Sequence, residues 1–148
     1  MFGIFTGNKS FKSEFNETVL SASITIGDFK EGIQIPVDYW GIKQYYASWL
    51  SSLKKGIYGK NNATLVVSMY PPKDANFLFS WVLYFRQEKV IVQNKMIFLD
   101  EINDFSIDKI NEYTSEYEAY SGGEKVSEWY TTIDEVKEFM SYLESKIS

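Results

Sequence analysis

Two apolar runs separated by a short polar turn constrain the fold of this chain more than any other feature. Phe77–Arg86 and Lys89–Leu99 have the length of β-strands, and the connection between them has hairpin length. One face of the first run is made of Phe77, Phe79, Trp81, Leu83 and Phe85. The opposite face carries Leu78, Val82 and Tyr84. Apolar residues on both faces predict a central strand that is covered on both sides, with a helix on at least one of them.

Helical spacing of apolar residues predicts two principal α-helices. The first covers about residues 38–55, with Asp38 as its N-cap and Gly56 just beyond its end. The second covers about 133–147 and opens with the capping box Thr132–Glu135. Together with the hairpin, these helices predict an α+β fold with a mainly antiparallel β-sheet, in which residues 1–148 form a single domain.

The remaining segments give weaker patterns. Further strands are predicted at Val19–Ile26, Gly32–Ile35 and Thr64–Tyr70, and a further hairpin over Tyr117–Tyr130. Residues 1–18 are poorly patterned and predict a loop, and Asp100–Glu118 predicts an acidic, irregular connection. The residues expected in the core are Phe79, Trp81, Leu83, Trp49 and Met140. For Trp40 and Tyr45, a core position and an interface position remain equally open.

The composition favours a binding protein over an enzyme. The chain has no histidine and no cysteine, so it lacks the commonest general base, the commonest metal ligands and the best nucleophile. We therefore expect no catalytic residues, cofactor or metal. The N-terminus lacks the basic and apolar regions of a secretory signal, and no apolar run approaches the roughly 20 residues of a membrane helix. We expect a cytoplasmic protein with no membrane partner.

Charge is unevenly distributed along the chain. Residues 99–148 contain thirteen Asp and Glu against four Lys, a net charge of −9, whereas residues 1–98 have a net charge of +4. A negative field of this kind repels nucleic acid and attracts a basic protein surface. The charge pattern therefore predicts a basic protein partner and no nucleic acid.

The same carboxylates permit other interpretations. Asp100, Glu101, Asp104 and Asp108 could form an oxygen-ligand metal site, but their spacing lacks the turn glycine and final glutamate of an EF-hand loop, and a solvated acidic loop is favoured. Paired carboxylates also serve small hydrolases, provided that two converge in an apolar cleft with separated pKa values. A small carboxylate-dependent hydrolase and an acidic protein-interaction adaptor are therefore the alternative functions.

One central segment is similar to a known family. Ser68–Tyr84, with the sequence SMYPPKDANFLFSWVLY, resembles a segment of the immunity proteins of bacterial contact-dependent growth inhibition systems. Other pieces match in order, namely Tyr39-Trp40, Trp49, Phe98–Glu101 and Gly123–Trp129. The similarity covers roughly residues 37–140.

The resemblance implies a small cytoplasmic protein that neutralises the C-terminal toxin domain of a surface-delivered effector by occlusion, without catalysis. Such toxins are often nucleases, and many cleave tRNA. A nuclease presents a basic groove for phosphates, which an acidic, aromatic-rich partner can cover. The acidic connection is then the expected toxin-binding surface, with Asp100, Glu101, Asp104, Asp108, Glu112, Glu116 and Glu118 as its residues.

Overall fold

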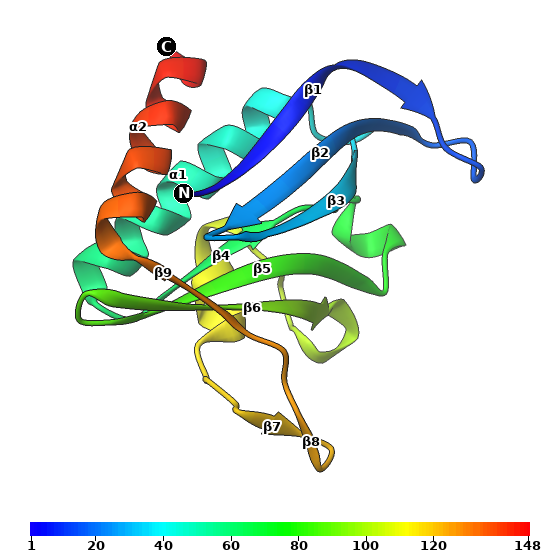
Figure 1. The fold of residues 1–148 in the computed structure, drawn as a ribbon. Coiled ribbons are helices and arrows are strands. Elements are labelled where there is room, and N and C mark those ends of the chain that lie inside the picture. The colour runs from blue at the N-terminus through cyan, green and yellow to red at the C-terminus, as the bar shows by residue number, and fades with distance from the viewer.

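The computed structural model describes residues 1–148 and confirms a mainly antiparallel α+β architecture (Figure 1). The strands are β1 Phe2–Lys12, β2 Thr18–Ile26, β3 Phe29–Pro36, β4 Asn62–Val66, β5 Phe77–Arg86, β6 Lys89–Phe98, β7 Tyr120–Ser121, β8 Glu124–Lys125 and β9 Trp129–Thr132. The α-helices are α1 Ile42–Gly59 and α2 Ile133–Ile147, and short 3-10 helices span Pro72–Asp74, Leu99–Glu101 and Ile107–Thr114. No helix combines the length and the apolar composition of a membrane span.

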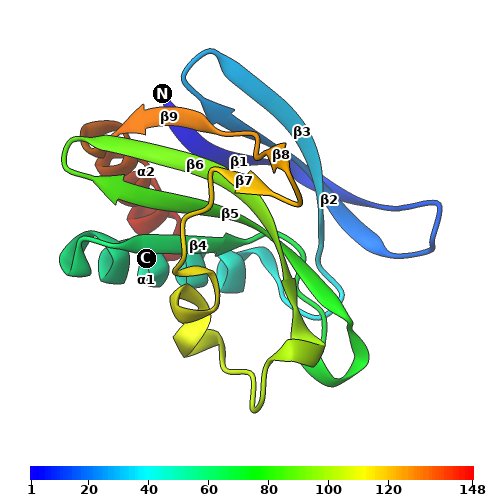
Figure 2. The same ribbon diagram turned by 90° about the horizontal axis from the view of Figure 1, so that it is seen from below.

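The strands form three antiparallel sheets, and the two larger ones enclose the core. The first sheet has the order β1-β2-β3, the second has the order β4-β5-β6-β9, and β7 pairs with β8. Helix α1 packs along β4, and α2 packs against α1 and β1 (Figure 2). A continuous cluster of 27 buried residues links both larger sheets and both helices.

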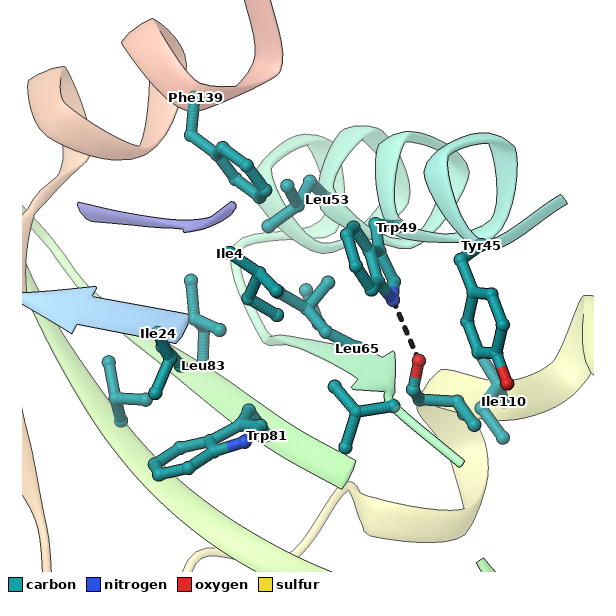
Figure 3. Close-up of a cluster of buried hydrophobic side chains, with 14 of the residues drawn as sticks. Ile4, Ile24, Tyr45, Trp49, Leu53, Leu65, Trp81, Leu83, Ile110 and Phe139 are labelled. Atoms are coloured by element: carbon teal, nitrogen blue, oxygen red, sulfur yellow. Dashed lines mark hydrogen bonds between the residues drawn. The ribbon is translucent and has the colours of Figure 1, made fainter. Parts of the chain in front are cut away.

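The core contains large side chains from every layer (Figure 3). Trp49 of α1 and Phe139 of α2 lie beside Ile4 of β1 and Leu65 of β4. The Trp49 indole nitrogen donates to the carbonyl oxygen of Val66 at 2.7 Å, so its polar group is satisfied inside the core. Tyr45 is also fully buried, and its hydroxyl donates to the Pro36 carbonyl at 2.6 Å. The structure thus assigns Tyr45 to the core.

The predicted central hairpin is confirmed. β5 and β6 pair from Phe77 opposite Phe98 to Arg86 opposite Lys89, and Trp81 and Leu83 are buried as expected. Phe79 was predicted to be in the core, but it is 48% exposed. Met140 is only half-buried and packs at the edge of the core.

The loop prediction for residues 1–18 is wrong for most of that segment. β1 pairs with β2 from Phe2 opposite Ile26, with a shift in register between Thr6 and Ser10. The small and polar residues of this segment hide the strand from a propensity-based prediction, because tertiary pairing outweighs local preference. Gly3 is required for the packing, since a Cβ atom there would lie 2.5 Å from the Phe5 ring.

Helix α1 begins and ends later than predicted. Its N-cap is Gly41 rather than Asp38, whose carboxylate instead accepts from the backbone N–H of Thr18 at 3.0 Å. Gly56 lies inside the helix, where a Cβ atom would be 2.5 Å from the Asn62 carbonyl oxygen. The glycine therefore permits close approach of α1 to β4 rather than ending the helix. The helix ends at Gly59, and the C-cap residue Lys60 adopts the left-handed conformation with φ 55°.

The other predicted elements are confirmed in part. α2 has the expected bounds, and its Thr132 hydroxyl accepts from the backbone N–H of Glu135 at 3.2 Å. β4 is shorter than the predicted strand and ends at Val66. The predicted Tyr117–Tyr130 hairpin contains the two-residue strands β7 and β8, and the chain then continues into β9, which pairs with β6 instead.

Candidate functional site

The acidic segment, residues 99–118, lies over the face of the second sheet that points away from the core. Its longer 3-10 helix, Ile107–Thr114, contacts α1, β4 and β6. From there the chain passes across β5 and β6 to reach β7 (Figure 2). The segment is therefore supported along its length, and it is less irregular than the sequence predicts.

Ile110 and Asn111 attach the 3-10 helix to the sheet edge. Ile110 is buried with the core cluster. The Asn111 side chain accepts from the backbone N–H of Thr64 at 2.8 Å and donates to the Ser52 carbonyl at 3.1 Å. The Asn62 side chain donates to the Asn111 carbonyl at 2.9 Å. These bonds satisfy a backbone donor on the free edge of β4 and connect this edge to α1.

Donors on β5 and β6 hold the rest of the segment. The Tyr84 hydroxyl donates toward the carbonyl oxygens of Thr114 at 2.9 Å and Glu116 at 3.0 Å. The Lys95 ammonium donates to Glu116 O at 2.9 Å and to the Tyr84 hydroxyl at 2.8 Å. Burial raises the pKa of Tyr84 and lowers the pKa of Lys95. The sheet therefore holds the segment by its backbone oxygens and leaves its acidic side chains free.

All seven predicted toxin-binding carboxylates are exposed. None of their oxygens has a hydrogen bond or an ion pair, and the sole salt bridge of the structure joins the N-terminal ammonium to Glu135. They occupy successive parts of the segment, from Asp100 and Glu101 in the first 3-10 helix, through Asp104 in the loop, to Glu118 before β7. No three Asp or Glu side chains of the chain converge as metal ligands. The seven carboxylates are therefore exposed along the acidic segment and do not form a chelating cluster.

A second feature was missed by the sequence prediction. Phe77, Phe79, Met96 and Phe98 are exposed together near one end of the β5–β6 hairpin. The alternation of the strand marks Phe77 and Phe79 as a core face, but it carries no information on which neighbouring elements cover that face. No local pattern in the sequence marks this exposure, since β4 already ends at Val66, ahead of the Pro71-Pro72 pair.

Comparison with known proteins identifies the family of this chain. The family model of the CdiI N-terminal domain matches residues 35–139. The immunity protein CdiI of Enterobacter cloacae subsp. cloacae is 45% identical over 140 residues, which cover 94% of this chain and 96% of that protein. The chain belongs to the CdiI family of immunity proteins. The resemblance of the central segment is thereby confirmed.

The CdiI fold is also shared with a solved structure. The CdiA-CT/CdiI toxin and immunity complex from Enterobacter cloacae contains a chain that superposes with a TM-score of 0.93 at 44% identity. The match covers 98% of this chain and 99% of that one. It therefore includes β1 and β2, which lie outside the residues matched by the CdiI family model.

Proposed function

We propose that this chain binds the toxin domain of a contact-dependent growth inhibition effector and neutralises it by occlusion, in the cytoplasm and with residues 1–148 acting as one immunity domain. The main support is the solved toxin and immunity complex, which contains a chain 44% identical to this one over 98% of its length. The toxin that this chain recognises is a nuclease, because a basic phosphate-binding groove complements its acidic surface.

The acidic segment is the first contact with that toxin. Seven exposed carboxylates with no internal partner give a local negative field, and their backbone is already held by Asn62, Tyr84 and Lys95. A fixed backbone reduces the conformational entropy lost on binding. The field steers a basic toxin toward the segment and raises the association rate, with a strong dependence on salt.

A hydrolase is less well supported by the same carboxylates. The seven acidic residues are all exposed and spread along the segment, and no three Asp or Glu side chains of the chain converge. Burial raises the pKa of Glu128, but hydrogen bonds from Tyr117, Tyr130 and Gln93 outweigh it and leave the pKa below its ordinary value. Glu128 is thus held as a hydrogen-bond acceptor, whereas a general acid needs a raised pKa.

Coexpression with the toxin tests the proposal. The C-terminal domain of the effector encoded with this chain is expressed under an inducible promoter in a laboratory bacterial strain, with and without the chain. We expect growth arrest and degraded RNA or DNA without the chain, normal growth with it, and a stable complex on size exclusion. Arrest that persists at full expression of the chain, with no complex, would contradict neutralisation. Arrest with intact nucleic acid would contradict only the nuclease assignment.

A further inference from the structure

The β5–β6 hairpin carries an unusual exposed apolar surface. Phe77 and Phe79 on β5 pair with Phe98 and Met96 on β6, so the four side chains share one face. Their exposed fractions lie between 37% and 48%, and the Phe77 and Phe79 rings pack edge to face with centroids 5.3 Å apart. We call these four residues the aromatic ribbon. Contiguous apolar surface of this kind marks interaction sites in proteins that are otherwise well packed.

The ribbon is exposed because the hairpin extends beyond its neighbours. The β4–β5 ladder ends at Val66 opposite Ser80, followed by one further bond from the Val67 N–H to the Phe79 carbonyl at 3.0 Å, and β9 pairs with β6 only over Lys89–Val92. Toward the end that contains Phe77 and Phe98, β5 and β6 extend as a two-stranded hairpin beyond the other strands of their sheet (Figures 1 and 2). Trp81, on the same face, is only 3% exposed. The apolar alternation therefore continues past the point where the core ends.

A groove runs beside the ribbon, between β3 and the hairpin. Its volume is about 860 Å³, and its apolar lining includes Ile33, Phe79, Trp81 and Met96. Glu31 and Glu118 also line it, and neither carboxylate has an internal hydrogen bond or ion pair. Lys95 lines the groove as well, and its ammonium donates to the Tyr84 hydroxyl and to the Glu116 carbonyl. The groove therefore combines an apolar surface with two carboxylates and one ammonium that already has acceptors.

The position of the groove beside the acidic segment and the charges that line it indicate which partner would fill it. Glu118 belongs both to the groove and to the acidic segment, and the segment begins directly after Phe98. An apolar patch bordered by charged residues matches the apolar centre and polar rim of a protein interface. A second copy of this chain would bring its own free carboxylates against Glu31 and Glu118, which disfavours self-association. A basic partner faces no such repulsion.

We propose that the aromatic ribbon and its groove form the apolar anchor of the toxin interface, and that they receive an apolar side chain of the toxin flanked by Lys or Arg. This inference rests on the proposed function and adds a division of roles to it. The acidic segment accelerates association, and the ribbon slows dissociation, since desolvated aromatic contacts dominate the energy of most interfaces.

The test is the dissociation rate of the purified toxin domain from ribbon variants. Phe79→Ala and Phe98→Ala remove half-exposed side chains, so both variants should stay folded and lower the melting temperature by no more than about 4 °C. We expect dissociation to accelerate about 10- to 100-fold, with the salt dependence of association unchanged. Phe15→Ala and Tyr58→Ala are matched controls, because both side chains are highly exposed outside the ribbon, and they should leave dissociation unchanged.

A measurement on the unmodified chain accompanies the variants. Met96 is exposed, so hydrogen peroxide should oxidise it readily, and bound toxin should slow that oxidation while Met1 oxidation is unaffected. Unchanged dissociation and unprotected Met96 in a chain that still binds toxin would overturn the anchor and leave the proposed function intact. A dimer that Phe79→Ala disrupts, with toxin binding unchanged, would assign the ribbon to a second copy instead. Failure of the wild type to bind the toxin at all would overturn the proposed function itself.

Discussion

The two halves of β5 have the same apolar alternation, but the side chains of one half are buried and those of the other half are exposed. Trp81, Leu83 and Phe85 are buried beneath the helices and the first sheet, whereas Phe77 and Phe79, on the same face, remain exposed. The difference lies in the neighbours, because the regular pairing of β4 ends opposite Ser80 and that of β9 ends opposite Val92, and only Val67 and Ser68 continue beside Phe79. Alternation therefore identifies a face of a strand, and the reach of the adjacent elements decides whether that face becomes core or surface.

The largest expected difference between the two halves of β5 is in how much each contributes to the free energy of unfolding. Trp81→Ala leaves a cavity in the core and should lower the free energy of unfolding by about 3–5 kcal/mol, whereas Phe79→Ala removes a half-exposed ring and should cost about 1 kcal/mol or less. Urea unfolding of both variants measures the two effects. Equal losses would show that Phe79 belongs to the core, as its alternation alone suggests.

The acidic segment extends the comparison to the opposite face of the sheet. Asn111→Ala removes the acceptor for Thr64 N–H and the donor to the Ser52 carbonyl, so it should lower stability by about 1–3 kcal/mol. Hydrogen exchange should show faster opening of residues 107–118 than of the β5–β6 hairpin. An unchanged exchange pattern would mean that Asn111 does not hold the segment in place.

A smaller effect is expected from pH. The pKa of Glu128 is lowered in the folded chain, so the charged carboxylate stabilises the fold above the ordinary Glu pKa, and this contribution disappears as pH falls through the lower folded value. Glu128→Gln removes this titration. We expect the stability difference between wild type and variant to be largest near pH 7 and to shrink below about pH 4.5.

Unfolding curves from pH 7 to pH 3 test this expectation. Tyr117→Phe and Tyr130→Phe remove hydroxyls that donate to Glu128 at 2.7 Å and 2.6 Å, and each should raise the carboxyl pKa. A difference between wild type and Glu128→Gln that is constant across this range would remove Glu128 from the groups that link pH to stability.

Local signals made part of the fold predictable. The hairpin follows from alternation within β5 and β6, and α2 follows from its apolar spacing and the Thr132 cap. β1 could not be predicted, because its pairing with β2 compensates for a segment rich in glycine and polar residues. Asp38 has the right chemistry for a helix cap, but its carboxylate accepts from Thr18, a partner twenty residues away that local spacing does not identify.

The candidate site, like the fold, could be predicted from the sequence only in part. The acidic composition of residues 99–118 is visible in the sequence, and the exposure of its seven carboxylates follows from that composition. The donors that hold its backbone come from Asn62, Tyr84, Gln93 and Lys95, which no local pattern connects to it. Which of the seven residues contact the toxin stays a prediction.

A charge-matched comparison of association rates tests the central claim most directly. Asp104→Asn with Asp108→Asn removes two charges from the acidic segment, and Glu138→Gln with Glu144→Gln removes two exposed charges from α2. Asparagine tolerates the left-handed backbone at position 104, so the segment pair should remain folded. In stopped-flow mixing with the toxin domain at low salt, the account predicts that the segment pair slows association at least about threefold more than the helix pair, and that high salt removes the difference. Equal slowing by both pairs, or greater slowing by the helix pair, would contradict a specific role for the acidic segment.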